Sequence, residues 1–118
     1  MQLNFDNKGD IKMIENIEID KKKKAKLKII TALKDTTIKQ IVLQEITNIL
    51  ENNTPITEHT ITRNRESLII DVDATLKAKI KQHAYENNTK IRDIWIQAVD
   101  QIIKQNEIGE LINDEKII

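Results

Sequence analysis

The sequence has few residues of several kinds, and each shortage excludes a class of chemistry. The chain of 118 residues has no Cys, which excludes disulfides, a thiol nucleophile and a thiolate metal site. His59 and His83 are its only histidines, too few for the usual His-based zinc site. Gly9 and Gly109 are its only glycines, so it cannot form a Gly-rich phosphate loop. No nucleophile, base and orienting group cluster together, so we expect no catalysis, metal or cofactor.

Two further absences concern membranes and export. No apolar run approaches the roughly 18–20 residues of a membrane span. The first residues, MQLNFDNKGD, lack the basic-then-apolar order of a signal peptide. Aromatic residues make up 3% of the chain and hydrophobic residues 39%, so isoleucine must supply a small core. A chain of this length is one domain, and we expect it to be soluble and cytoplasmic, with no membrane contact.

Charge is plentiful and lies in alternating blocks. Lys and Arg together number 19, as do Asp and Glu, so the formal net charge is zero. Residues 20–39 nevertheless sum to +6, from eight Lys against Asp20 and Asp35. Residues 63–92 sum to +3, from seven Lys and Arg against four Asp and Glu. Two basic blocks separated by an acidic one indicate a feature that occurs twice.

An internal repeat accounts for this alternation. A shift of 53 residues places 17–53 on 70–106 without a gap, and 12 of the 37 aligned positions are identical. Composition alone would give about four matches. The identities include Asp20/Asp73, Lys24/Lys77, Ala25/Ala78, Ile41/Ile94 and Gln44/Gln97. We interpret the chain as two copies of one unit, and matched lysines such as Lys24 and Lys77 as solvated helix surface.

Each copy begins with a strand. Apolar residues occupy every second position at 17–19 and 68–72, which is the pattern of a strand with one buried face. We expect 14–19 and 67–72 to pair as one antiparallel ribbon, because each strand otherwise lacks a partner. The side chains expected to face the helices are Ile17, Ile19, Ile70 and Val72.

Two helices follow the strand in each copy. The predicted boundaries are the N-caps Asp20 and Asp73, the left-handed turn residues Asp35 and Asn88, and the hydroxyl caps at Thr36-Thr37 or Thr89-Lys90. The second helices have an apolar face at helical spacing. The residues predicted to be nearly fully buried there are Ile41, Ile46, Ile94 and Val99, with Trp95 also in the core and His83 partly exposed.

A strand, an Asp cap, a helix, a short turn and a helix in about 40 residues resemble the ribbon-helix-helix (MetJ/Arc-type) family. The second copy, LIIDVDATLKAKIKQHAYENNTKIRDIWIQAV, fits best, whereas Lys23 and Glu45 replace apolar residues in the first. Members of this family dimerise, since so short a unit cannot bury enough surface alone. The resemblance implies a mainly α fold in which two tandem units form an intramolecular pseudo-dimer around one antiparallel two-stranded ribbon.

This fold divides the chain into five segments. They are an N-terminal arm (1–13), a first unit (14–53), a linker (54–66), a second unit (67–106) and an acidic, apolar tail (107–118). The two units form one globular domain. The tail either frays, or docks as a short helix on the pseudo-dimer or on a partner.

The resemblance also implies a DNA-binding surface. In the family the ribbon enters the major groove, where outward strand residues read base edges, and second-helix N-termini hold phosphates. The base-reading candidates are Asn16, Glu18, Ser67, Ile69 and Asp71. The phosphate candidates are Thr36, Thr37, Lys39, Thr89, Lys90, Arg92, Arg63, Arg65, Lys21 and Lys22. Glu18 and Asp71 depart from the family's usual basic or neutral readers, because phosphate repels them.

We therefore predict a small protein that binds double-stranded DNA in the cytoplasm or nucleoid. It would regulate transcription or copy number, or assist plasmid transfer or partition, with several pseudo-dimers able to assemble on DNA. The alternative is a protein-interaction module that presents Glu18, Ile69 and Asp71 to a protein. An antitoxin combines both, with the tail at 107–118 wrapping a toxin. Salt-dependent retention on DNA separates these hypotheses.

Overall fold

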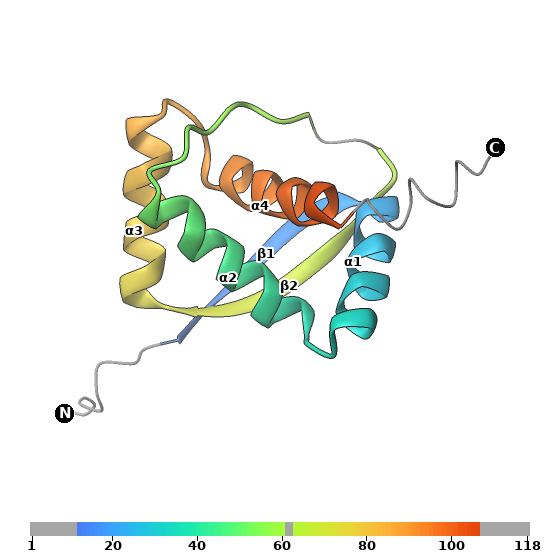
Figure 1. The fold of residues 1–118 in the computed structure, drawn as a ribbon. Coiled ribbons are helices and arrows are strands. Elements are labelled where there is room, and N and C mark those ends of the chain that lie inside the picture. Colours follow the sequence, from blue (N-terminus) through green and yellow to red (C-terminus); the bar gives the residue numbers. More distant parts are fainter. Residues whose placement is uncertain (1–11, 61–62, 107–118) are drawn as a thin grey trace.

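The computed structural model describes residues 12–60 and 63–106, so most of the predicted arm and the whole predicted tail lie outside the described residues. The elements are β1 (Lys12–Asp20), α1 (Lys21–Lys34), α2 (Ile38–Glu51), β2 (Arg65–Asp73), α3 (Ala74–Glu86) and α4 (Ile91–Gln105). The order strand, helix, helix occurs twice (Figure 1). The expectation of a mainly α fold with a short ribbon is confirmed.

β1 and β2 pair with each other as an antiparallel ribbon (Figure 1). Asn16 lies opposite Ile69 at the middle of the ribbon, with Ile17 opposite Leu68 beside it. The predicted pairing of the two segments within one chain is confirmed. Each strand has nine residues, so both extend beyond the predicted bounds.

One face of the ribbon is buried under the helices. The four side chains predicted to lie there, Ile17, Ile19, Ile70 and Val72, are each 4% exposed or less. α2 and α4 lie across this face, while α1 and α3 lie near the two ends of the ribbon (Figure 1). The alternating pattern thus identified the correct buried face, and a strand with one covered face is what it indicates.

Helix starts and ends follow the predicted chemistry at most positions. The carboxylate of Asp20 accepts from the backbone N–H two residues on, and that of Asp73 from the one three residues on, both at 2.7 Å. The hydroxyl of Thr37 caps α2 in the same way at 3.1 Å. Asp35 and Asn88 both have a φ of 56°, the left-handed conformation that ends a helix. These local predictions are confirmed.

The start of α4 differs from the prediction of a hydroxyl cap at Thr89. That hydroxyl donates to the carbonyl of Ala84 (3.3 Å). The Asp93 carboxylate instead accepts from the backbone N–H of Lys90 (2.9 Å) and of His59 (3.0 Å). A charged carboxylate binds backbone donors more strongly than a hydroxyl does, and the Asp93 carboxylate here binds two of them. The prediction that Thr89 caps α4 is therefore wrong.

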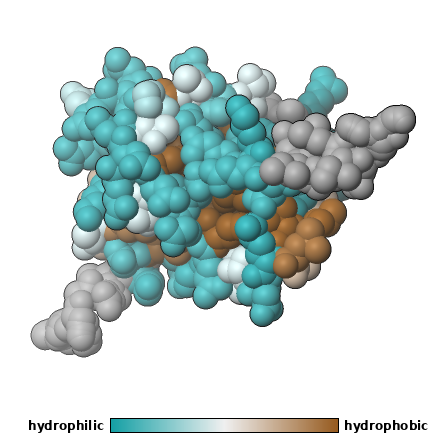
Figure 2. Space-filling model, in the orientation of Figure 1, coloured by the Kyte–Doolittle hydropathy of each residue, from teal (hydrophilic) through white to brown (hydrophobic). Residues whose placement is uncertain are grey.

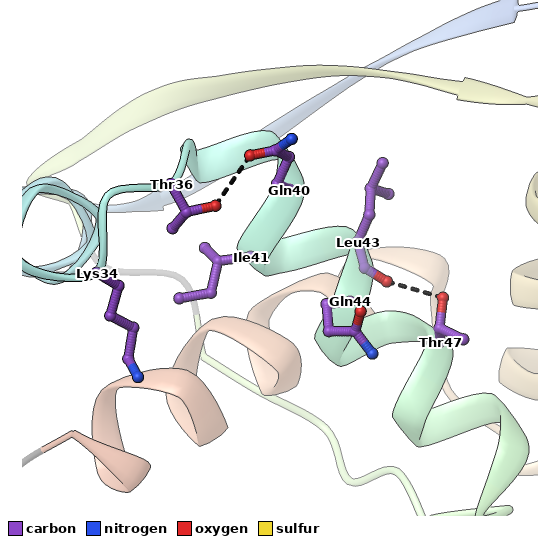
Figure 3. Close-up of a pocket in the computed structure, with 7 residues that line it drawn as sticks. All are labelled: Lys34, Thr36, Gln40, Ile41, Leu43, Gln44 and Thr47. Carbon is purple, nitrogen blue, oxygen red and sulfur yellow. Dashed lines mark hydrogen bonds between the residues drawn. The ribbon is translucent and has the colours of Figure 1, made fainter.

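The helices bury their apolar faces in one core. Ile46, Ile94, Val99 and Trp95 are 0% exposed, as predicted. Ile41 is only half-buried, so the prediction is wrong for that residue. It lies one turn into α2, where it lines a shallow groove between the end of α1 and α2 (Figure 3).

Two polar side chains are buried with partners from distant elements. Glu45 is 6% exposed and accepts from the side-chain amides of Gln101 (2.6 Å) and Gln105 (3.2 Å). His83 is 5% exposed, and its Nε2 lies 2.7 Å from the carbonyl oxygen of Thr54. The prediction of a partly exposed His83 is wrong, because the segment after α2 packs over it. Both groups follow the rule that buried polar atoms are hydrogen-bonded.

Truncating Ile94 should test the assignment of the core face. Ile94→Ala should lower the free energy of unfolding by roughly 2–5 kcal/mol, because it leaves a cavity that its closed surroundings cannot fill. Ile29→Ala is the matched control, since Ile29 is 60% exposed and its truncation should cost less than about 0.5 kcal/mol. Urea denaturation measures both. A loss below about 1 kcal/mol for Ile94→Ala would contradict the core assignment.

Candidate nucleic-acid interface

The face of the ribbon turned away from α2 and α4 presents three side chains from the middle part of each strand. They are Ile14, Asn16 and Glu18 of β1, and Ser67, Ile69 and Asp71 of β2. We call these six residues the outer ribbon face. Ile14 is 72% exposed and Ile69 64%, whereas Ser67 and Asp71 are half-buried. All five predicted base-reading candidates lie on this face.

Ile14 is the member of the outer ribbon face that the sequence prediction missed. It lies two residues before Asn16, so its side chain points to the same side of the strand, and it is opposite Asp71. Extending the alternating pattern by one step would have included it. The middle of the outer ribbon face therefore has two exposed isoleucines beside Asn16 and Ser67.

Both acidic side chains of the outer ribbon face are in ion pairs. Arg65 Nε lies 2.6 Å from Glu18 Oε1, and Lys39 Nζ lies 2.9 Å from Asp71 Oδ1. The four side chains are each close to half exposed, so the pairs contribute little to stability. Their larger effect is on charge, because a cation beside each carboxylate reduces its repulsion of an approaching anion.

The hydrogen bond from Lys39 lowers the pKa of Asp71 below its ordinary value of 3.8. A backbone hydrogen bond of Asp71 and the positive charges of Lys39 and Lys12 act in the same direction, while desolvation opposes them. Asp71 is therefore ionised at neutral pH. Lys39, a predicted phosphate contact, is bound to a carboxylate of the protein itself.

The other predicted phosphate contacts divide by what their side chains bind. Arg65 is paired with Glu18, the Thr36 hydroxyl donates to Gln40 Oε1 (3.0 Å), and the Thr37 hydroxyl caps α2. Thr89 is bound to a carbonyl within the protein. Among the predicted phosphate contacts, five cations are exposed and form no ion pair with another residue of 12–60 or 63–106: Lys21, Lys22, Arg63, Lys90 and Arg92.

The two second helices begin differently. Lys39, in the first turn of α2, contacts Asp71 of β2, so the start of α2 lies beside the ribbon. The partly positive backbone N–H groups at the start of α2 therefore also lie near the ribbon. The first turn of α4 contains Asp93, whose negative charge is buried with 2% exposure. That carboxylate opposes an anion at the start of α4, where Lys90 and Arg92 carry positive charge.

One matched pair of lysines of the repeat, Lys24 and Lys77, binds the ribbon. Lys24 Nζ donates to the carbonyl of Ser67 (2.7 Å), and Lys77 forms an ion pair with Glu15 of β1. Both lysines are half-buried. The prediction that they are solvated helix surface is wrong, because each ammonium group ties the first helix of its copy to the opposite strand.

The described residues show neither a metal cluster nor a membrane span. Within 12–60 and 63–106, no group of three or more His, Cys, Asp or Glu side chains could hold a metal ion. None of the described helices is long and apolar enough to cross a membrane. Comparisons with protein-family models, curated proteins and solved structures found no match to the chain. The outer ribbon face and its flanking cations are therefore the basis for a functional proposal.

Removing Lys39 should raise the pKa of Asp71 toward its ordinary value, because Lys39→Ala removes the hydrogen bond that lowers it most. NMR titration of the Asp71 carboxyl carbon measures this change. Since the folded pKa is the lower one, the contact stabilises the protein above a pH of about 4 and is lost as the pH falls through the folded pKa. Lys104→Ala, at an exposed position of α4, should leave the titration unchanged. An identical titration in Lys39→Ala and the parent would show that the ion pair is absent in solution.

Proposed function

We propose that the chain is a tandem ribbon-helix-helix protein that binds double-stranded DNA through the outer ribbon face. The ribbon itself supports this best, since two strands of one chain pair and expose a face whose two carboxylates are already ion-paired. The major groove of B-DNA admits a two-stranded ribbon and lets its side chains reach base edges.

The register of the ribbon supports a pseudo-dimer of two units. Asn16 and Ile69 are equivalent positions of the repeat, 53 residues apart, and they lie opposite each other at the middle of the ribbon. Equivalent residues of two units meet in this way on a two-fold axis. Glu18 and Asp71 are also 53 residues apart and so equivalent positions of the repeat. Their ion pairs lie on opposite sides of the Asn16 and Ile69 pair.

Affinity for DNA would come from the cations around the ribbon. The exposed cations among the predicted phosphate contacts that form no ion pair within the described residues are Lys21, Lys22, Arg63, Lys90 and Arg92. Because the formal net charge is zero, attraction to the phosphate backbone depends on these local charges. A small DNA-binding protein of this kind would regulate transcription or copy number, or assist plasmid transfer or partition, and several copies could bind side by side.

The two exposed isoleucines also favour a second candidate, a protein-interaction module that uses the same face. Ile14 is 72% exposed and Ile69 64%. On DNA, such side chains would contact thymine methyl groups. On a protein they would fill an apolar pocket, as the anchors of an interface do. An antitoxin would combine the two activities.

Selection from a pool of random duplexes tests the DNA proposal directly. A DNA-binding chain should enrich one sequence, and its retention should fall steeply between about 50 and 200 mM salt as counterions compete for the phosphates. An absence of retention at low salt would contradict DNA binding and leave the interaction module as the function.

Removing two unpaired cations at the start of α4 should weaken binding to all duplexes alike. Lys90→Ala with Arg92→Ala removes two phosphate contacts, so the slope of log affinity against log salt should fall by roughly two. Lys79→Ala with Lys81→Ala removes the same charge from exposed positions of α3 and is the control. Equal effects of both pairs on the salt slope would mean that net charge, and not contact at α4, attracts the DNA.

Thymine methyl groups in the selected site should contribute to binding. Replacing thymine by uracil removes one methyl group, worth about 0.8 kcal/mol when buried, and should weaken binding roughly fourfold at a contacted position. Ile14→Ala with Ile69→Ala should abolish this difference in titrations of the two duplexes, and Tyr85→Ala, which changes an exposed side chain of α3, should retain it. Equal affinity of the parent protein for both duplexes would contradict apolar readout and leave DNA binding intact.

A further inference from the structure

Each acidic side chain of the outer ribbon face forms a unit of two charges with its cation. Arg65 Nε lies 2.6 Å from Glu18 Oε1, and Lys39 Nζ lies 2.9 Å from Asp71 Oδ1. Arg65 precedes Ser67 by two residues, so its side chain points to the same side of β2, where it is a diagonal neighbour of Glu18 across the ribbon. We call Glu18 with Arg65, and Asp71 with Lys39, the charge pairs.

A charge pair places a hydrogen-bond acceptor directly beside a donor. The contact within the first pair uses Nε of Arg65 and one oxygen of Glu18. A guanidinium has five N–H donors, and a carboxylate has two oxygens with several lone pairs. The four side chains are between 44% and 48% exposed. Each charge pair therefore keeps capacity for a ligand that offers a donor and an acceptor side by side.

A G·C base pair offers this combination in the major groove. Cytosine presents its N4 amino group as a donor, and guanine presents O6 and N7 as acceptors. N4 and O6 are hydrogen-bonded to each other in the base pair, so they lie about 2.9 Å apart, close to the spacing within each charge pair. In an A·T pair the acceptors N7 and O4 lie on either side of the N6 amino group. An A·T pair therefore lacks two adjacent acceptors for one guanidinium.

We propose that the charge pairs read G·C base pairs, with each carboxylate accepting from cytosine N4 and each cation donating to guanine. This inference rests on the proposed binding of double-stranded DNA. Arg65 can donate to O6 and N7 together, whereas the ammonium group of Lys39 is a compact point charge. Glu18 with Arg65 should therefore discriminate between base pairs more strongly than Asp71 with Lys39.

The ribbon fixes the distance between the two G·C pairs. Glu18 lies opposite Ser67, and Asp71 is four residues beyond Ser67 on β2, which is about 13 Å along the ribbon. Successive base pairs are about 3.4 Å apart along the duplex axis, so the two G·C pairs are at most about four steps apart. The recognised sequence should contain both within about five base pairs, with the bases that Asn16 and Ile69 contact between them.

Simple neutralisation of the acidic side chains predicts a different result. If Arg65 only offsets the charge of Glu18, then Glu18→Ala should tighten binding to all duplexes by the same factor, because phosphate is repelled less. If Glu18 accepts from cytosine, Glu18→Ala should also lower the preference for G·C at one position. The preference between duplexes, and not the overall affinity, therefore separates the two roles.

Removing one whole charge pair tests the proposal without a change of net charge. Selection from random duplexes should give the parent chain a site with two G·C pairs, and replacing either by A·T should weaken binding, about tenfold at the Arg65 position. Glu18→Ala with Arg65→Ala should reduce this penalty to less than about twofold at one position and keep it at the other, which Asp71 and Lys39 read. Half-exposed ion pairs contribute little to stability, so this variant should fold.

The matched control removes a carboxylate and a cation from the helix side of the molecule. Figure 2 views this side, which hydrophilic side chains mostly cover. Glu51→Ala with Lys104→Ala changes exposed residues of α2 and α4 and should keep the penalty at both positions. Substituted bases locate the contact at Arg65: 7-deazaguanine, which lacks N7, should weaken binding at least about threefold, whereas inosine, which keeps O6 and N7, should not.

Three results would overturn the proposal. A selected site without two G·C pairs in about five base pairs, or a preference that survives Glu18→Ala with Arg65→Ala at both positions, would overturn it and leave DNA binding intact. Equal tightening by Glu18→Ala on the G·C and A·T duplexes would show that the carboxylate is only neutralised. An absence of any retention on DNA would overturn the proposed function together with this inference.

Discussion

The pairing of β1 with β2 is the interaction on which the rest of the structure depends. Within 12–60 and 63–106, each strand of the ribbon has only the other as its hydrogen-bonded neighbour, and the partner comes from the other half of the chain. A two-stranded ribbon is marginal by itself in water, so it requires the apolar faces of α2 and α4 on its inner side. The apolar faces of α2 and α4 are in turn buried against the ribbon side chains Ile17, Ile19, Ile70 and Val72. Neither half has a complete core alone, and we expect one cooperative unfolding transition.

The parts of the fold that depend on neighbours in sequence could be predicted, and those set by distant segments could not. Asp20 and Asp73 cap helices through amides two or three residues away, and the alternating strand pattern needs no knowledge of the partner. His83 is buried because the segment that contains Thr54 packs against its ring, where the Thr54 carbonyl lies within hydrogen-bond distance of Nε2. The sequence around His83 gives no sign of this distant contact. Asp93 replaces the predicted Thr89 cap because it also holds the backbone after α2.

The same distinction applies to the candidate site. Side-chain alternation placed every predicted base reader on the outer ribbon face. The ion pairing of Glu18 and Asp71 was not predictable from the sequence. It depends on the position of Arg65 on the opposite strand and on the packing of α2, which places Lys39 beside Asp71. Two carboxylates that repel phosphate and two cations taken as phosphate contacts prove to be partners of each other. An anion that approaches this face must compete with bound carboxylates for those cations, which lowers affinity for phosphate without regard to base sequence.

A single chain with two copies is also released from the symmetry of a homodimer. In a dimer of identical units, every side chain on one side of the axis is repeated on the other, and the preferred site is a palindrome. Here Asn16 lies opposite Ile69 at the middle of the ribbon, so a hydrogen-bonding group faces an aliphatic one across the axis. Ser67 and Ile14 differ in the same way at equivalent positions. The starts of α2 and α4 differ too, with a hydroxyl cap at one and a buried carboxylate at the other. Under the proposed function, the two halves of the bound site would present different chemistry, and the recognised sequence would not be a palindrome.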